Sequence, residues 1–253
     1  MPIQYARSLT SNASSQRTIR HLGVTLAFIA GAANAGGFLA VKVYTSHMTG
    51  IVSSLADNRA LGEFTLALGA LGTALSFLFG AMVSAIMINY GRRRALRSLF
   101  ALPLLLEAGL FLLFGFMGAT LADVPGLFVP ATVMLLCLTM GLQNAVITKI
   151  SGSVVRTTHL TGVVTDLGID LGKLVYWNRT DAGPEQRVLA DRDRLTMLAM
   201  LIASFLVGGV LGAIGFQQFG YLATVPLAGI LVLLSAVPVF DDLRGIGEGS
   251  GEA

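Results

Sequence analysis

The chain has 253 residues, of which 54% are hydrophobic and only 12% are charged. A soluble domain carries about 25% charged residues, because polar side chains have to cover its surface. The composition therefore excludes a soluble globular protein and predicts an integral membrane protein. The net charge of +3 does not indicate a nucleic-acid partner, since in a membrane chain the position of the positive residues sets the topology. The one cysteine, Cys137, excludes an intrachain disulfide and lies in an apolar run, where a small buried side chain is expected.

Six membrane spans are predicted from the uncharged stretches of the chain. The first 21 residues are polar and lack the apolar core of a cleaved signal peptide, so they predict a cytoplasmic tail. Crossing a hydrocarbon core of about 30 Å takes about 20 helical residues. Four stretches meet this length: 22–41, 64–90, 124–148 and, interrupted only by Glu107, 98–122. The run 195–240 is about twice as long, and its Gln-Gln-Phe-Gly break at 217–220 predicts a tight turn between two helices.

The distribution of Lys and Arg predicts that both ends of the chain lie inside the cell. With the N-terminus inside, 15 of the 17 Lys and Arg residues fall in inner segments, and only Lys42 and Arg59 fall outside. Positive residues that flank a span resist translocation, so this orientation is favoured. It places Asn58 outside and the loop 178–194 inside, in a bacterial cytoplasmic membrane.

The sequence contains an internal repeat. TSHMTGIVSSL at 45–55 matches TTHLTGVVTDL at 157–167, GAANA at 31–35 matches GLQNA at 141–145, and SFLFGAMVSAI at 76–86 matches SFLVGGVLGAI at 204–214. Each copy holds three spans, and an odd number requires the copies to cross the bilayer in opposite senses. The predicted fold is an all-α membrane protein of six transmembrane helices in two inverted three-helix repeats, 22–122 and 123–240. Residues 176–194 form a polar loop, and the Gly-rich segment 241–253 predicts disorder.

The repeated Thr-x-His-x-Thr-Gly motif predicts a re-entrant half-helix in each copy. Thr49 and Thr161 are candidate N-caps, and Gly50 and Gly162 allow close approach to the backbone. Two half-helix N-termini that face each other near the membrane midplane would favour an anion or a polar ligand. The alternative is that these threonines only cap their helices.

The motif histidines, His47 and His159, leave two interpretations open. They could titrate near neutral pH and couple transport to protons, or they could only bond backbone carbonyls. Two histidines without helical His-x-x-x-His or Glu-x-x-His spacing do not predict a metal site, and no cofactor is expected.

Other polar residues within the spans complete the candidate site. Asn34 and Asn144 could line a cavity or bond across helices, and Glu107 is the one acid inside a clear span. Asp170 is expected to form a solvated pair with Lys173 at the rim, with Asp166 deeper. Small residues four apart, Gly80 with Ser84 and Gly208 with Gly212, predict close helix packing. The candidate solute-binding residues are Thr45, His47, Thr49, Gly50, Thr157, His159, Thr161, Gly162, Asn34, Asn144, Asp166 and Glu107.

The stretches GAANAGGF, TSHMTG and GLQNAVITKISGSVVRTTHLTG, together with the six-span plan, resemble the YoaK-type (UPF0700) family of uncharacterised bacterial membrane proteins over about residues 20–240. The first copy departs from the family's usual Thr-Gly-Asn, because Ile51 follows Gly50. The resemblance implies a polytopic protein of the cytoplasmic membrane and carries no substrate with it.

The inverted repeat with paired half-helices predicts a small-solute transporter. The same elements could form a channel. A membrane scaffold or regulator would need no polar cavity, and an intramembrane enzyme is disfavoured because the sequence has no Gly-x-Ser-x-Gly elbow or zinc-type His-Glu pair. The expected partners are the lipid bilayer and a small polar or anionic solute, with no nucleic acid; proton coupling and homo-oligomer formation are left open.

Overall fold

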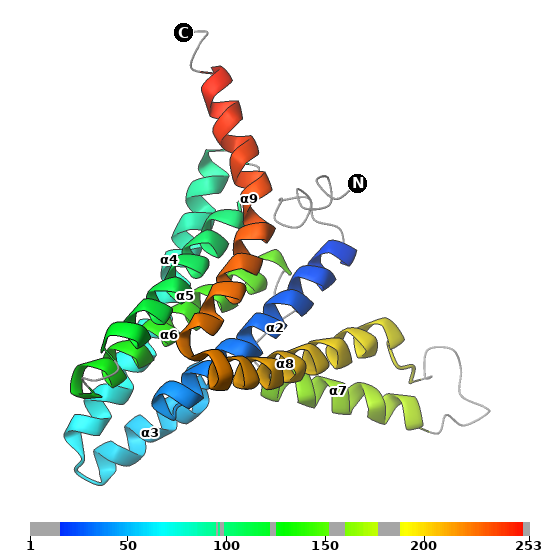
Figure 1. Cartoon of the computed structure of the whole chain (residues 1–253). Helices are drawn as coiled ribbons and strands as arrows, with labels where there is room; N and C mark the ends of the chain where they lie inside the picture. The colour runs from blue at the N-terminus through cyan, green and yellow to red at the C-terminus, as the bar shows by residue number, and fades with distance from the viewer. Residues whose placement is uncertain are drawn as a thin grey trace.

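The structure, a computed structural model, describes residues 16–94, 96, 99–121, 125–151, 160–176 and 188–249. These residues form α-helices and one 3₁₀ turn, without a strand among them (Figure 1). The elements in order are α2 (Gln16–Val41), α3 (Met48–Ala60), α4 (Phe64–Arg93), α5 (Ala101–Leu121), α6 (Pro125–Ile150), α7 (Leu160–Val175), α8 (Arg192–Phe219), η2 (Gly220–Ala223) and α9 (Thr224–Gly249).

The predicted spans coincide with long apolar helices. In the described part of the chain, five stretches are long and apolar enough to cross a membrane: four lie within α2, α4, α5 and α6, and the fifth, Arg192–Ala236, runs over α8 into α9. The predicted break at 217–220 is confirmed in position, because α8 ends at Phe219. Gly220 then adopts φ 58°, a backbone conformation that favours glycine.

The outer faces of these helices are apolar. Large hydrophobic side chains such as Leu68 and Leu78 of α4, and Leu206 and Leu211 of α8, are more than half exposed. Apolar surface of this extent is unfavourable in water and suits contact with lipid. The multi-pass membrane class predicted from composition therefore agrees with the way the helices present their side chains.

Helices α2 and α8 lie side by side (Figure 1) and approach closely at glycines. A Cβ added to Gly31 of α2 would collide with the carbonyl oxygen of Phe205 of α8. In return, a Cβ on Gly208 would collide with the carbonyl oxygen of Phe28. Small residues let two helix backbones come this close, so the predicted packing role of Gly208 is confirmed.

Helices α4 and α6 cross in the same way. Gly80 of α4 faces the carbonyl oxygen of Leu138, and Gly141 of α6 faces the carbonyl oxygen of Phe77. The offsets of the sequence repeat make Gly31 equivalent to Gly141, and Gly80 equivalent to Gly208. The two crossings are therefore built from equivalent residues of the two copies.

Helices α5 and α9 form the third pair. The end of α5 meets the start of α9, where Gly115 lies against Thr224 and Gly118 lies against the ring of Tyr221. A buried apolar cluster fills the space among α2, α5, α6 and α9, and includes Leu26, Phe111, Leu142 and Leu231. The buried position expected for Cys137 is also confirmed.

Helix α9 extends to Gly249, into the segment 241–253 for which composition predicts disorder. Extending an existing helix fixes fewer dihedral angles per hydrogen bond than starting a new one. The apolar span of α9 can therefore continue as a helix into the polar residues that follow it.

Candidate functional site

Two short helices, α3 and α7, begin in the middle of the molecule. The predicted half-helix from Thr49 corresponds to α3, which begins at Met48 and has His47 as its N-cap, with φ −89° and no side-chain capping bond. The prediction that Thr49 is the N-cap is therefore wrong, and the same holds for Thr161, since α7 begins at Leu160. Thr49 is the second residue of α3, and Thr161 is the second described residue of α7.

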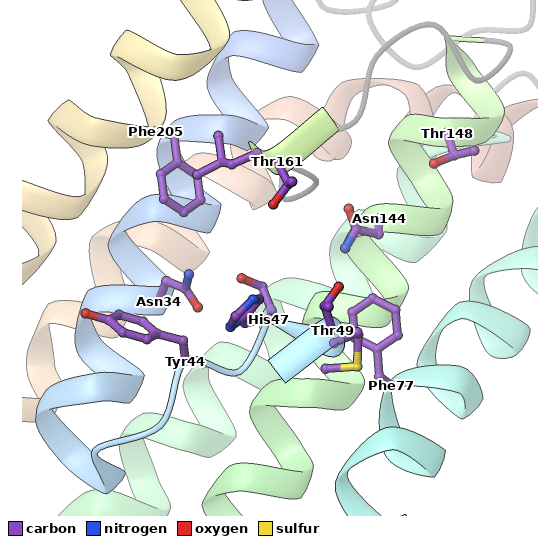
Figure 2. Close-up of a pocket in the computed structure, with 12 residues that line it drawn as sticks. Asn34, Tyr44, His47, Thr49, Phe77, Asn144, Thr148, Thr161 and Phe205 are labelled. Carbon is purple, nitrogen blue, oxygen red and sulfur yellow. The ribbon is translucent and has the colours of Figure 1, made fainter. Parts of the chain in front are cut away.

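A cavity of about 480 Å³ lies where α3 and α7 begin (Figure 2). We call it the central cavity. It is lined by Asn34, Tyr44, Ser46, His47, Met48, Thr49, Phe77, Asn144, Thr148, Leu160, Thr161 and Phe205.

Most of this lining consists of equivalent residues from the two copies of the repeat. The equivalent pairs are Asn34 with Asn144, Thr49 with Thr161, Met48 with Leu160, and Phe77 with Phe205. Figure 2 shows Asn34 on α2 and Asn144 on α6 projecting toward the space between these helices. The cavity is thus formed jointly by the two halves of the chain.

His47 lies at the edge of the central cavity and folds over the first turn of α3. A Cβ on Gly50 would lie 2.7 Å from Nδ1 of His47, so glycine at this position makes room for the imidazole. The close approach predicted at Gly50 is therefore made by a side chain of the same segment. Among the described residues, no three His, Cys, Asp or Glu side chains are grouped so that they could hold a metal ion.

A second cavity of about 800 Å³, the vestibule, lies among α3, α4 and α6. Tyr44 and His47 line both the vestibule and the central cavity. Tyr44 is held by stacking on Phe38, with ring centroids 4.7 Å apart and planes 14° apart, and Lys42 Nζ lies 5.6 Å from the centroid of Phe38. The short segment between α2 and α3 therefore separates the two cavities.

Several predicted site residues do not line the central cavity. Thr45 is fully buried, and its carbonyl oxygen accepts a hydrogen bond from Cys137 Sγ at 3.1 Å. Glu107 is fully buried in α5, and neither of its carboxyl oxygens has a partner within the described part of the chain. Gly162 lies in α7 outside the lining. Thr157 and His159 fall outside the described residues.

The two aspartates of α7 are arranged opposite to the prediction. Asp170 is fully buried and pairs with Lys173 at 3.0 Å and with Arg194 at 3.3 Å, whereas the Asp166 side chain is 44% exposed and pairs with Arg194 at 2.9 Å. The difference in burial depends on which face of α7 packs against α8. Asp170 lies two turns after buried Val163 on the packed face, while Asp166 lies about 60° round the helix from Val163.

Sequence reasoning did not identify the aromatic part of the lining. Phe77 and Phe205 are the second residues of the matched Ser-Phe stretches, so the repeat contained a signal for them. In both stretches the small residues Gly80 and Gly208 predict helix packing, and no prediction was attached to the phenylalanines. Tyr44 had no such signal, because its place depends on how the segment before α3 folds back.

Several long apolar helices with exposed apolar side chains, around a cavity lined by both polar and apolar residues, define a multi-pass membrane protein. Within this class the chain belongs to the family described as protein of unknown function (DUF1275), whose model matches residues 22–237. Comparisons with curated proteins and with solved structures gave no match.

Proposed function

We propose that this protein transports a small solute across the bacterial cytoplasmic membrane through the central cavity. The observation that carries the proposal is the lining of this cavity by equivalent residues of both repeats, at the starts of two half-helices. Transporters built from internal repeats hold their substrate where equivalent broken elements of the two halves meet. A scaffold would need no polar cavity, so the lining favours transport.

We further propose that the repeats are inverted. Exchanging α2 with α6 and α4 with α8 maps the contact of Gly31 with Phe205 onto that of Gly141 with Phe77. A two-fold axis produces such reciprocal contacts. When α8 and α9 are counted as separate spans, each repeat has three, and the axis then lies in the membrane plane.

The lengths of α3 and α7 support a re-entrant arrangement. The 13 residues of α3 and the 16 described residues of α7 extend about 20 and 24 Å, which is less than the hydrocarbon thickness of about 30 Å. Backbone that is not helical is tolerated at membrane depth where it lines a cavity. The segment before α3 meets this condition, since Tyr44, Ser46 and His47 line the central cavity.

The resemblance noted in the sequence leads us to infer that the DUF1275 chains include the YoaK-type proteins. The inference rests on the Thr-His-Leu-Thr-Gly motif of the second copy.

We expect both termini to be cytoplasmic, as the Lys and Arg distribution predicts. Cysteine labelling in intact cells tests this, with buried Cys137 replaced by serine. Leu61, between α3 and α4, and Leu189, before α8, are 77% and 76% exposed and make a matched pair. The Leu61→Cys thiol should react with an impermeant reagent from outside, and the Leu189→Cys thiol only after permeabilisation. The reverse pattern would invert the orientation.

Transport should depend on the hydroxyl of Thr161. We expect Thr161→Val to lower uptake into proteoliposomes about ten-fold, the equivalent of one hydrogen bond to the solute. The probes are urea, nicotinamide and uracil, each with an anion of similar shape: nitrate, nicotinate and orotate. Thr165→Val is the matched control, because Thr165 lies one turn along α7 outside the lining and donates to the carbonyl oxygen of Thr161 at 2.8 Å. Equal rates for Thr161→Val and the wild type would contradict a role for this hydroxyl.

A further inference from the structure

Apart from His47, the described side chains that line the central cavity carry no charge. Among its described residues there is no Asp, Glu, Lys or Arg. Enclosed anions in proteins are usually held by Arg or Lys, whose charge-assisted hydrogen bonds offset the lost hydration. The ion pair of Asp170 with Arg194 joins α7 to α8 outside this lining. The lining therefore suits an uncharged solute better than an anion.

The central cavity contains a hydrogen-bond acceptor that lacks a donor. Oδ1 of Asn34 is buried and has no hydrogen-bond partner within the described ranges. Leaving a buried amide oxygen without a donor is unfavourable. A solute with an N–H group would satisfy it, whereas an inorganic anion such as nitrate has no hydrogen to donate.

The start of α3 supplies donors to the same space. The N–H of Met48 donates to Ser46 and that of Ile51 donates to His47, at 3.1 Å each. The N–H groups of Thr49 and Gly50 lie between them, where a helix has no preceding turn to accept their hydrogens. The N-cap His47 makes no side-chain capping bond. A carbonyl oxygen on the solute could therefore accept from this first turn.

The remaining surface of the cavity includes two aromatic rings. Phe77 of α4 and Phe205 of α8 are equivalent in the repeat and both line the cavity. Aromatic side chains bind flat apolar faces well, and ligand sites commonly combine such surfaces with a few polar groups.

We propose that the central cavity selects an uncharged solute of the amide or ureide class, with Asn34 as a specificity-determining residue. An amide or ureide has both the N–H that Asn34 Oδ1 lacks and the carbonyl that the first turn of α3 can bind. Its planar frame suits the faces of Phe77 and Phe205. The proposal rests on the transport function proposed above, and it replaces the anion expected from the half-helix starts.

The test compares the three matched probe pairs in proteoliposomes at neutral pH. We expect at least one of urea, nicotinamide and uracil to enter proteoliposomes faster than it enters protein-free liposomes. The uptake rate of that solute should be about ten-fold or more above the rate of its anionic counterpart. Asn34→Leu should lower the rate for the accepted neutral solute about ten-fold, because the acceptor is removed. Asn89→Leu is the matched control, since Asn89 is exposed on α4 outside both cavities.

The outcomes separate the two proposals. Uptake of nitrate, nicotinate or orotate in preference to the neutral probes would overturn the solute class and leave transport standing. Neutral uptake that Asn34→Leu and Asn89→Leu reduce equally would overturn the role of Asn34. If none of the six probes enters faster than into protein-free liposomes, both proposals fail. Thermal unfolding of each variant in detergent confirms that a lower rate does not come from an unfolded chain.

Discussion

Valine at Gly31 is expected to destabilise the protein strongly, and valine at Gly141 should do so to the same degree. Each glycine faces a main-chain carbonyl oxygen of the neighbouring helix, which cannot move aside as a flexible side chain could. Overpacking costs about 1–3 kcal/mol, and the upper end is expected here because the helices must separate along their contact. We expect the midpoint of thermal unfolding in detergent to fall by about 10 °C for either variant.

The control for this prediction is a glycine with open space. A Cβ on Gly229 of α9 or Gly109 of α5 would have no neighbour within 4 Å. Gly229→Ala and Gly109→Ala should leave the unfolding midpoint unchanged or raise it slightly, since alanine favours helix. Unequal losses for Gly31→Val and Gly141→Val would argue against the equivalence of the two crossings.

The second large effect is expected where α7 is joined to α8. Asp170 is fully buried and has two cationic partners, Lys173 and Arg194. The double variant Lys173→Met with Arg194→Met would leave a buried carboxylate without a counter-charge. Loss of such partners costs about 3–5 kcal/mol, so the unfolding midpoint should fall by about 10 °C.

Adding Asp170→Asn to this double variant should restore much of the loss, because the uncompensated charge is then gone. Asp166→Asn alone should cost less than about 1 kcal/mol, since both Asp166 and Arg194 are more than 40% exposed. If the triple variant is no more stable than the double variant, the buried charge is not the cause of the loss.

The corresponding positions of α3 carry no charge. The repeat makes Ser54 equivalent to Asp166, and Asn58 equivalent to Asp170. Asn58 Nδ2 donates to Ser54 Oγ at 3.0 Å within α3. The two half-helices therefore differ in how they are fixed: α7 is linked to α8 by ion pairs, and the equivalent pair in α3 is satisfied within its own helix.

The helices themselves were determined by the sequence, because the properties that define them are local. An uncharged run of about 20 residues has to be helical when lipid surrounds it, since every backbone polar group needs an internal partner. The break that ends α8 at Phe219 follows from an equally local signal. The capping signal at Thr49 did not give the start of α3, which begins one residue earlier with His47 as its N-cap. The repeat was also visible, and with it the pairs Asn34 with Asn144 and Thr49 with Thr161 that line the central cavity.

The tertiary structure decided which polar residues meet and which remain apart. Asp166 and Asp170 differ by one turn of α7, and only the contact with α8 determines that Asp170 is the buried one. Glu107 belongs to α5, which packs on α6 and α9 away from the cavity lining. Tyr44 reaches the cavity because the chain folds back after α2. Which polar side chains are buried, and which come into contact, depends on how neighbouring helices rotate and cross. The close contacts of Gly31 and Gly141 with main-chain carbonyl oxygens set those crossings, and they join residues far apart in the chain.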